Sequence, residues 1–253
     1  MKAYAKANIF LKLIGFDTRG YHLLQSRFVL LDTLFDELTL SKDKQKSGFE
    51  LQSDFECADN LIFKAYALLR EKGFAGALDE CFQSHALVLK KNIPICSGLG
   101  GGSTDAACFL NLMNESLNLG ISRENLMQMG ANLGCDVPFF VSGFQSANVS
   151  GVGELVAEFD DEIPPLDFTF SDIQCSTALV YKEFDKSKYD FDANLKHANK
   201  FKEQSSSELL AHKNTLLNDL FTPCVNLYPK MSAFLEQNFF LSGSGSAVFK
   251  VGQ

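Results

Sequence analysis

The sequence predicts a fold that combines β-strands with α-helices in one large or two small domains. The first observation is strict alternation over residues 3–13, with small or apolar side chains on one side of a strand. The second is the order strand, glycine-rich loop and helix over residues 87–117. The third is the acidic, proline-bearing run at residues 160–165, which is typical of a connector between domains. At 46% hydrophobic residues among 253, the chain can build a substantial core.

Residues 94–107 read Pro-Ile-Cys-Ser-Gly-Leu-Gly-Gly-Gly-Ser-Thr-Asp-Ala-Ala, with four glycines in five positions. Such a run is unsuited to a helix interior or a strand, so we expect a loop that ends at a helix carrying Ser103 and Thr104 near its start. Free N–H groups and the positive end of a helix dipole then surround one point, which suits phosphate. The run has neither the ending of a Walker A motif nor the last glycine of a Rossmann fingerprint. A tight turn without a ligand is the alternative.

In the first strand, Lys6 and Asn8 fall on the same side, one pleat apart. Taken alone, this stretch indicates a solvated strand face. Beside a phosphate loop, a lysine and an amide two residues apart can instead reach one anionic group together.

The remaining elements are predicted from the periodicity of hydrophobic residues and from residues that typically begin or end helices, strands and turns. We expect a turn at residues 17–20, an apolar stretch at 23–31, a hairpin between 35–40 and 49–52, helices at 61–72, 122–133, from 176 and 229–235, and a strand after Asp136.

Composition excludes several classes. The net charge of −8 disfavours a nucleic-acid partner. No apolar run reaches membrane-spanning length, and no signal-peptide core follows the N-terminus, so we expect a cytoplasmic protein without a membrane partner. Seven scattered cysteines without a C-x-x-C pair indicate neither a disulfide framework nor a zinc site.

Residues 94–107 resemble the phosphate-binding motif of the GHMP kinases, which include galactokinase, homoserine kinase and mevalonate kinase. Further segments are similar to the branch that acts on 4-diphosphocytidyl-2-C-methyl-D-erythritol. Cys135 departs from that branch's alanine, and the chain ends six residues after Ala247, where a longer tail is usual. The similar segments are Ala5-Lys6-Ala7-Asn8, Gly20-Tyr21-His22 and residues 134–140, 151–154, 176–181 and 218–220. Residues 241–247 resemble the third motif of the GHMP kinases, which packs against the phosphate loop.

The resemblance implies an α+β fold of two domains with the active site in the cleft between them. Residues 1–155 would form the N-terminal ATP-binding domain and residues 156–253 the C-terminal domain. The implied reaction moves the γ-phosphoryl group of ATP, with Mg²⁺, to the 2-hydroxyl of the cytidine-linked alcohol, within non-mevalonate isoprenoid synthesis. We expect this small molecule as the partner and a monomer or weak homodimer.

The resemblance also implies roles for individual residues. Lys6 and Asp136 would be catalytic, with Asp136 as the presumed base. The hydroxyls of Ser103 and Thr104 could lie near Mg²⁺. The nucleotide would contact Pro94, Gly98, Leu99, Gly100, Gly101, Gly102, Ser103, Thr104 and Asn60, and the acceptor would contact Asn8, Tyr21, His22, Thr177 and Tyr181.

Each role has a simpler alternative. Asp136 is also a turn former, Asn60 a helix cap and Tyr181 a packed helix aromatic. For the whole chain, a GHMP kinase of the homoserine or mevalonate type, or a non-catalytic ligand sensor on the same fold, stays open.

Overall fold

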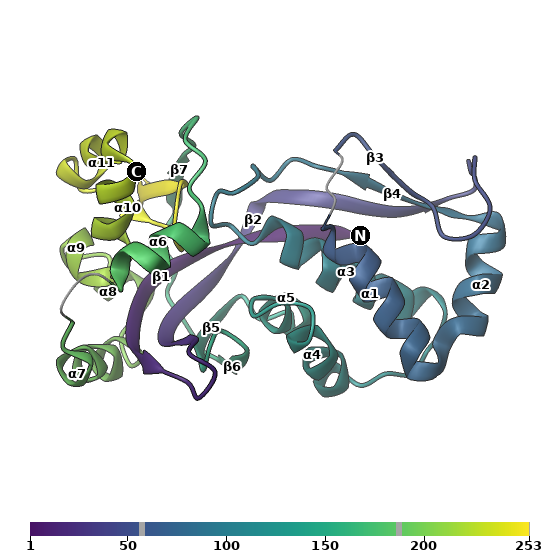
Figure 1. The fold of residues 1–253 in the computed structure, drawn as a ribbon, viewed down its shortest axis with the longest axis horizontal. Helices are drawn as coiled ribbons and strands as arrows, with labels where there is room; N and C mark the ends of the chain where they lie inside the picture. The colour runs from purple at the N-terminus through teal and green to yellow at the C-terminus, as the bar shows by residue number, and fades with distance from the viewer. Residues whose placement is uncertain (56–58, 186–188, 253) are drawn as a thin grey trace. The chain divides into compact units, whose positions relative to one another are not determined.

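The computed structural model describes residues 1–55, 59–185 and 189–252. The chain divides into two compact units, each built from separate stretches of sequence. Two long strands, β1 (Lys2–Phe16) and β2 (His22–Ser41), contribute to both units because the division falls inside each strand (Figure 1). The domain boundary expected after residue 155 stays a prediction. Unit 1 comprises Met1–Ala5, Leu31–Ile93 and Gly100–Gly143, and unit 2 comprises Lys6–Leu30, Pro94–Leu99 and Phe144–Gln253.

Unit 1 places helices beside a short run of paired strands. Its strand order is β3-β4-β2, in which β4 pairs antiparallel with β2 and parallel with β3. Helix α3 packs against α1 and α5, and α5 packs against α4 (Figure 1). Besides its parts of β1 and β2, the unit contains β3 (Leu51–Ser53), α1 (Leu61–Leu69), the π-helical turn η1 (Arg70–Phe74), α2 (Ala75–Ser84), β4 (Ala86–Lys90), α3 (Gly101–Ser116), α4 (Arg123–Ala131) and α5 (Val137–Ser142).

The hairpin predicted between residues 35–40 and 49–52 is wrong. Strand β4 lies between β2 and β3, so the two segments do not pair with each other. The physical reason is burial, because Ala86, Leu87 and Leu89 of β4 are all buried and need neighbours on both edges. The polar segment between β2 and β3 instead folds around Glu50, whose carboxylate accepts hydrogen bonds from the backbone of residues 45 and 46.

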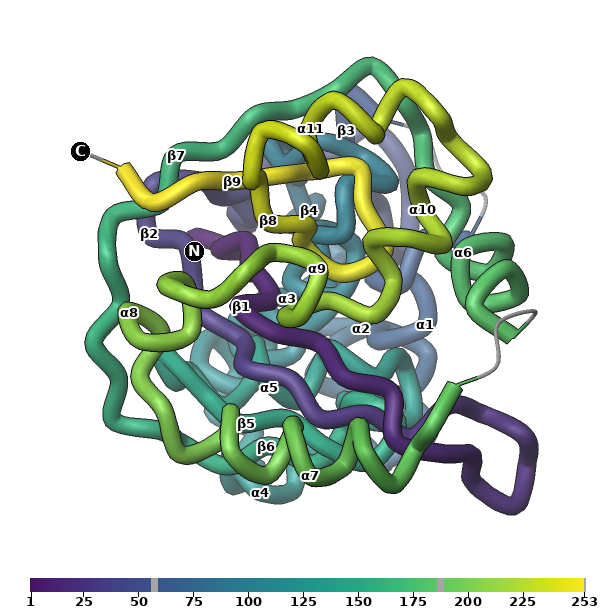
Figure 2. The backbone as a smooth tube through the Cα atoms, turned by 90° about the vertical axis from the view of Figure 1, so that its left-hand side faces the viewer, coloured from purple at the N-terminus to yellow at the C-terminus, as the bar shows by residue number. Residues whose placement is uncertain are grey.

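Unit 2 contains two groups of strands. Strands β2, β5 and β6 are antiparallel neighbours, and β7, β9 and β8 form a separate three-stranded antiparallel sheet (Figure 2). Helix α10 packs against α6. The elements are β5 (Ser146–Ser150), β6 (Leu155–Glu158), β7 (Leu166–Thr169), α6 (Thr177–Phe184), α7 (Phe191–Phe201), α8 (Ser206–Leu209), α9 (Asn214–Leu217), α10 (Phe221–Leu227), the 3₁₀ turn η2 (Pro229–Met231), α11 (Ser232–Glu236), β8 (Phe240–Leu241) and β9 (Val248–Val251).

The first predicted strand is confirmed, but its polar face is not solvated. The side chains of Lys6, Asn8 and Lys12 are buried along with the apolar ones of β1. Buried ammonium and amide groups need partners, and each of the three has them within unit 2. The polar side of this strand is therefore an internal feature of the fold.

Helix start signals in the sequence are confirmed at three places. Asn60, Ser122 and Ser176 each accept a hydrogen bond from a backbone N–H in the first turn of α1, α4 and α6. Gly73, which follows the predicted helix at residues 61–72, has a φ of 99° at a kink inside η1.

The strand predicted after Asp136 is wrong, because residues 137–142 form helix α5. Pro138 sits in its first turn, where a helix loses no hydrogen bond to proline. All six residues are buried, so the segment is a helix in the core. A continuous apolar run has no periodicity by which a helix can be distinguished from a strand.

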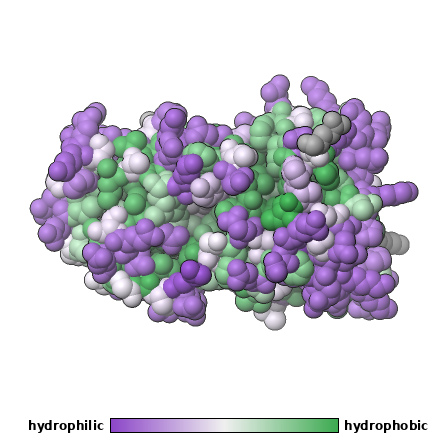
Figure 3. Space-filling view, turned by 180° about the vertical axis from the view of Figure 1, so that it is seen from behind, coloured by the Kyte–Doolittle hydropathy of each residue, from purple (hydrophilic) through white to green (hydrophobic). Residues whose placement is uncertain are grey.

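On the face that Figure 3 draws, hydrophobic residues reach the surface in patches among hydrophilic ones. Within the described residues, no helix has the length and apolar character needed to cross a bilayer. Six cysteines lie in the described part of the chain, and all are free thiols; Cys57 lies outside it.

Candidate functional site

The first half of the glycine run, residues 94–99, packs against the second glycine loop at residues 242–247, both in unit 2. Ala247 donates its N–H to Ser97 O at 3.0 Å, and Ser242 Oγ donates to Gly98 O at 3.2 Å. Gly98 has a φ of +78°, and a Cβ there would overlap the backbone oxygen of Ser242. The contact between the two glycine loops that the resemblance implies is thus present, and it requires glycine at residue 98.

Lys6 and Asn8 join this assembly from strand β1. The Lys6 ammonium donates to Asn8 Oδ1 at 2.6 Å and to Gly98 O at 3.0 Å. Asn8 Nδ2 donates to Ser26 Oγ at 2.9 Å, and its backbone N–H donates to Ser242 Oγ at 3.3 Å. The two side chains do point the same way, and the glycine run contributes a carbonyl to the lysine.

The second half of the glycine run begins helix α3 in unit 1. Gly100 is the N-cap with a φ of 75°, and Gly101 and Gly102 are the first helical residues, so the expectation that the run stays outside the helix is wrong there. A helix leaves its first N–H groups without intrahelical partners, and no side chain caps this one. Among the described residues, leaving out its two chain neighbours and the nearby backbone of its own helix, no heavy atom lies within 4 Å of a Cβ built at Gly102, so a ligand can approach the first turn closely.

The hydroxyls of Ser103 and Thr104 differ in access. Thr104 is buried, whereas Ser103 is partly exposed in the first turn of α3. Mg²⁺ bound with a nucleotide usually keeps several waters and takes oxygens from phosphates, so it needs few protein ligands. Ser103 is therefore the better placed of the two to hold it. Among the residues that the structure describes, no cluster of three or more His, Cys, Asp or Glu side chains could hold a metal ion.

Behind this turn lies a buried charge cluster that sequence reasoning missed. Lys91 donates to Asp105 Oδ2 at 2.7 Å and is also paired with Asp36. Burial raises the pKa of Asp105 to about 7 against the opposing effect of Lys91. The Lys91 ammonium is 3.4 Å from the position of a Cβ on Gly101. This cluster holds the start of α3 from one side.

The predicted substrate residue His22 packs against a second predicted substrate residue, Tyr181, in unit 2. Its ring lies 5.0 Å from the ring of Tyr181 and 4.6 Å from that of Phe16, and its Nε2 is 2.7 Å from Asp185 Oδ1. Tyr21 is 61% exposed, which leaves its ring accessible to a ligand.

Thr177, Tyr181 and Asp185 lie four residues apart along α6 and its C-cap, so they share one side of the helix. The hydroxyl of Thr177 is 2.8 Å from that of Ser244 in the second glycine loop. The helix thereby connects the aromatic cluster to the glycine loops. Asp185 was missed by sequence reasoning, because its contact with His22 joins residues that lie 163 apart in the chain.

Asp136 and Asn60 both stand at the start of helices in unit 1. Asp136 is the N-cap residue of α5, and its side chain makes no capping hydrogen bond to that helix. Asn60 Oδ1 accepts from Ile62 N at 2.9 Å, so it is confirmed as the cap of α1, while its contact with adenine stays a prediction.

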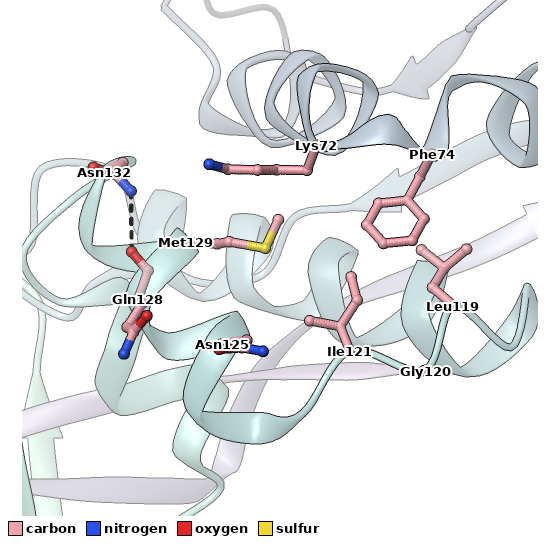
Figure 4. A pocket seen from close by; sticks show the side chains of 9 residues that line it. All are labelled: Lys72, Phe74, Leu119, Gly120, Ile121, Asn125, Gln128, Met129 and Asn132. Atoms are coloured by element: carbon pink, nitrogen blue, oxygen red, sulfur yellow. Dashed lines mark hydrogen bonds between the residues drawn. The ribbon is translucent and has the colours of Figure 1, made fainter.

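Unit 1 also has a pocket of about 470 Å³ next to η1 and α4. Figure 4 shows Lys72 and the amide of Asn132 toward one end and Phe74 with Leu119 toward the other. None of its lining residues is a predicted site residue, so it does not bear on the roles considered above.

Comparison with known proteins adds to this geometry. The model of the GHMP kinase N-terminal domain matches residues 60–144. A 4-diphosphocytidyl-2-C-methyl-D-erythritol kinase of Campylobacter jejuni is 56% identical over 254 residues, which covers 99% of both chains. The kinase of the same name from Sulfurimonas denitrificans is 40% identical over 99% of this chain and 96% of the relative.

Solved structures agree. A crystal structure of 4-(cytidine 5'-diphospho)-2C-methyl-D-erythritol kinase is 27% identical with a TM-score of 0.75, covering all of this chain and 90% of the other. A mevalonate kinase structure has a TM-score of 0.69 at 13% identity, covering all of this chain and 91% of the other, and it supports the fold alone.

Proposed function

Because this chain belongs to the 4-diphosphocytidyl-2-C-methyl-D-erythritol kinase family of GHMP kinases, we propose that it transfers the γ-phosphoryl group of ATP to the 2-hydroxyl of that alcohol. This is a step in the non-mevalonate route to isoprenoid precursors. The observation that carries the proposal is the 56% identity over 99% of both chains. An α+β fold shared with solved GHMP kinases accords with it.

The glycine run binds the phosphates of ATP. Residues 98–104 supply backbone N–H groups and a helix start, and this arrangement favours phosphate because the dipole is positive there. The uncapped first turn of α3 and the open space at Gly102 support this role. Mg²⁺, when bound, neutralises phosphate charge, and Ser103 is the residue we assign to hold it. Asn60, Pro94 and Leu99 are further residues that we assign to contact the nucleotide.

Lys6 steadies the phosphoryl group during transfer. Its ammonium donates hydrogen bonds to two oxygens, Asn8 Oδ1 and Gly98 O. Phosphoryl transfer depends mainly on positioning and charge stabilisation, and a buried cation fixed by hydrogen bonds provides both. Asn8 contacts the acceptor from the same side of β1.

Asp136 accepts the proton of the attacking hydroxyl or orients that hydroxyl. The residue is fixed at the N-terminus of α5. A base attached to a helix start has little backbone freedom, which suits the alignment that in-line attack needs.

The cytidine end of the substrate binds at the aromatic cluster of unit 2. Tyr21 and Tyr181 stack on the cytosine, His22 contacts its edge, and Thr177 lies one turn earlier on α6. The exposure of the Tyr21 ring and the 5.0 Å between the His22 and Tyr181 rings support this assignment.

The test of the function is ADP release by purified protein with ATP and Mg²⁺. Three acceptors are compared: the cytidine-linked alcohol, homoserine and mevalonate. We expect turnover with the first acceptor only. Turnover of homoserine or mevalonate without turnover of the cytidine-linked alcohol would refute the assignment, and loss of activity with all three would favour a ligand sensor.

The catalytic roles are tested by Asp136→Asn and Lys6→Ala. A general base contributes about 10²–10⁴-fold, so Asp136→Asn should lower kcat by that amount while ATP affinity stays close to that of the wild type. The double variant should lose less than the product of the two single losses, because residues that act as a unit are not additive. Asp43→Asn, at an exposed position of unit 1, is the matched control. Nearly full kcat in Asp136→Asn would leave the aspartate as a turn former.

A further inference from the structure

We propose that Asp185 determines the base specificity of this enzyme. By accepting a hydrogen bond from His22 Nε2, it holds His22 in the tautomer whose Nδ1 accepts, so that the site prefers the exocyclic amine of cytosine to the carbonyl of uracil. The inference rests on the proposed function, because it concerns the same cytidine site.

The pair is a direct contact between two distant parts of unit 2. His22 opens strand β2, Asp185 caps the C-terminus of α6, and 163 residues separate them in the chain. The distance from His22 Nε2 to Asp185 Oδ1 is 2.7 Å. The His22 side chain is 11% exposed and that of Asp185 is 44% exposed, so the carboxylate keeps contact with water while the imidazole is mostly covered.

Hydrogen-bond chemistry decides where the proton lies. An ionised carboxylate can only accept, so the nitrogen that faces Asp185 must carry the hydrogen. In a neutral imidazole with Nε2 protonated, Nδ1 is an acceptor. An amine such as N4 of cytosine can donate to it, whereas the O4 carbonyl of uracil would place two acceptors against each other.

The aromatic cluster fixes the ring while Asp185 fixes the proton. Phe16, Tyr181 and Phe184 have ring centroids 4.6, 5.0 and 5.8 Å from that of His22. These neighbours come from the end of β1 and from α6, so they surround the imidazole from different elements. A ring held in this way cannot readily turn over to exchange its two nitrogens.

A purely stabilising ion pair is the competing interpretation. A pair with a 44% exposed carboxylate contributes little to stability. Loss of such a pair would weaken the binding of cytidine and uridine ligands equally, since neither base would form a hydrogen bond that depends on the proton of His22. The ratio of the two affinities therefore separates the interpretations.

The experiment measures binding of CMP and of UMP by calorimetry to wild-type protein and to Asp185→Ala. We expect the wild type to bind CMP at least about tenfold more tightly than UMP, since a site built for a donor rejects an analogue that lacks it. Asp185→Ala should reduce this ratio by about fivefold or more. Asp192→Ala, at an exposed position in the first turn of α7, is the control and should leave the ratio unchanged.

Two further measurements make the test specific. In the His22→Ala background, adding Asp185→Ala should change the CMP/UMP ratio no further, because Asp185 acts through the imidazole. Nitrogen NMR of the imidazole should show hydrogen on Nε2 in the wild type and a mixture of tautomers in Asp185→Ala. An unchanged ratio in a folded Asp185→Ala protein would overturn the inference alone. Failure of the wild type to bind either nucleotide would overturn the cytidine site and the inference together.

Discussion

Asp219 lies at the centre of a buried polar cluster whose removal should be costly. Its side chain is fully buried and forms an ion pair with Lys12. It also accepts from Leu13 N and Tyr189 Oη, each at 2.8 Å, and from the amide of Asn194. Burial raises the pKa of Tyr189, and the nearby Asp219 adds to this, so the phenol stays a neutral donor. Four donors thus converge on one carboxylate.

The Asp219→Ala substitution leaves the buried Lys12 ammonium without a carboxylate. Removing one partner of a buried pair costs about 3–5 kcal/mol, which is a large part of a typical stability of about 5–15 kcal/mol. Lys12→Met should cost less, because the carboxylate keeps its three other donors. Tyr189→Phe should cost about 1–2 kcal/mol through the loss of one hydrogen bond.

The assay is urea unfolding at neutral pH, followed by circular dichroism, for the wild type and the three variants. The expected order of lost unfolding free energy is Asp219→Ala first, then Lys12→Met, then Tyr189→Phe. A loss below about 1 kcal/mol in Asp219→Ala, or a greater loss in Lys12→Met, would refute the reasoning that an uncompensated ammonium dominates the cost.

Three shorter predictions follow. Asp105 has a pKa raised to about 7, so between pH ~4 and ~7 the unfolded chain loses a proton that the folded chain keeps. The unfolding free energy should therefore fall as pH rises through this range. In urea titrations, this decrease should be smaller by about 1–3 kcal/mol in Asp105→Asn than in the wild type. Gly98→Ala should lower the unfolding free energy by roughly 1–3 kcal/mol because of its positive φ and the overlap with Ser242. Gly102→Ala, with open space around it, is its control and should cost nothing. Tyr181→Ala should raise the KM for the cytidine substrate about tenfold with the KM for ATP nearly unchanged in steady-state assays, since stacking contributes about 1–3 kcal/mol; equal losses for both would indicate packing.

Local signals predicted the helix starts well because a cap is a contact within a few residues. Asn60, Ser122 and Ser176 all bond to backbone groups two or three residues away. The hairpin failed because the partner of β2 is β4, which lies further along the chain than the segment chosen. Sequence distance alone favoured the nearer strand, whereas β4, with Leu87 and Leu89 buried, lies between β2 and β3 in the sheet.

The sequence predicted which site side chains share one side of a strand, but it did not predict their burial or their contacts with distant residues. Lys6 and Asn8 were placed on one side of a strand, which is correct, but their burial could not be read from alternation. Asp185 contacts His22 across 163 residues. No local pattern reports such a pair, because it depends on how α6 packs within unit 2.

The tripeptide Asn218-Asp219-Leu220 shows how a motif can resemble a family without carrying chemistry. Asn218 Nδ2 donates to Leu241 O and Gly243 O, each at 2.9 Å, and Asp219 binds Lys12 and the backbone of β1. The motif therefore holds the second glycine loop and the strand that bears Lys6 in place. Tyr21, by contrast, keeps 61% of its surface open to solvent. The polar atoms of Asn218 and Asp219 are used within the protein, whereas the ring of Tyr21 keeps an accessible face for a ligand.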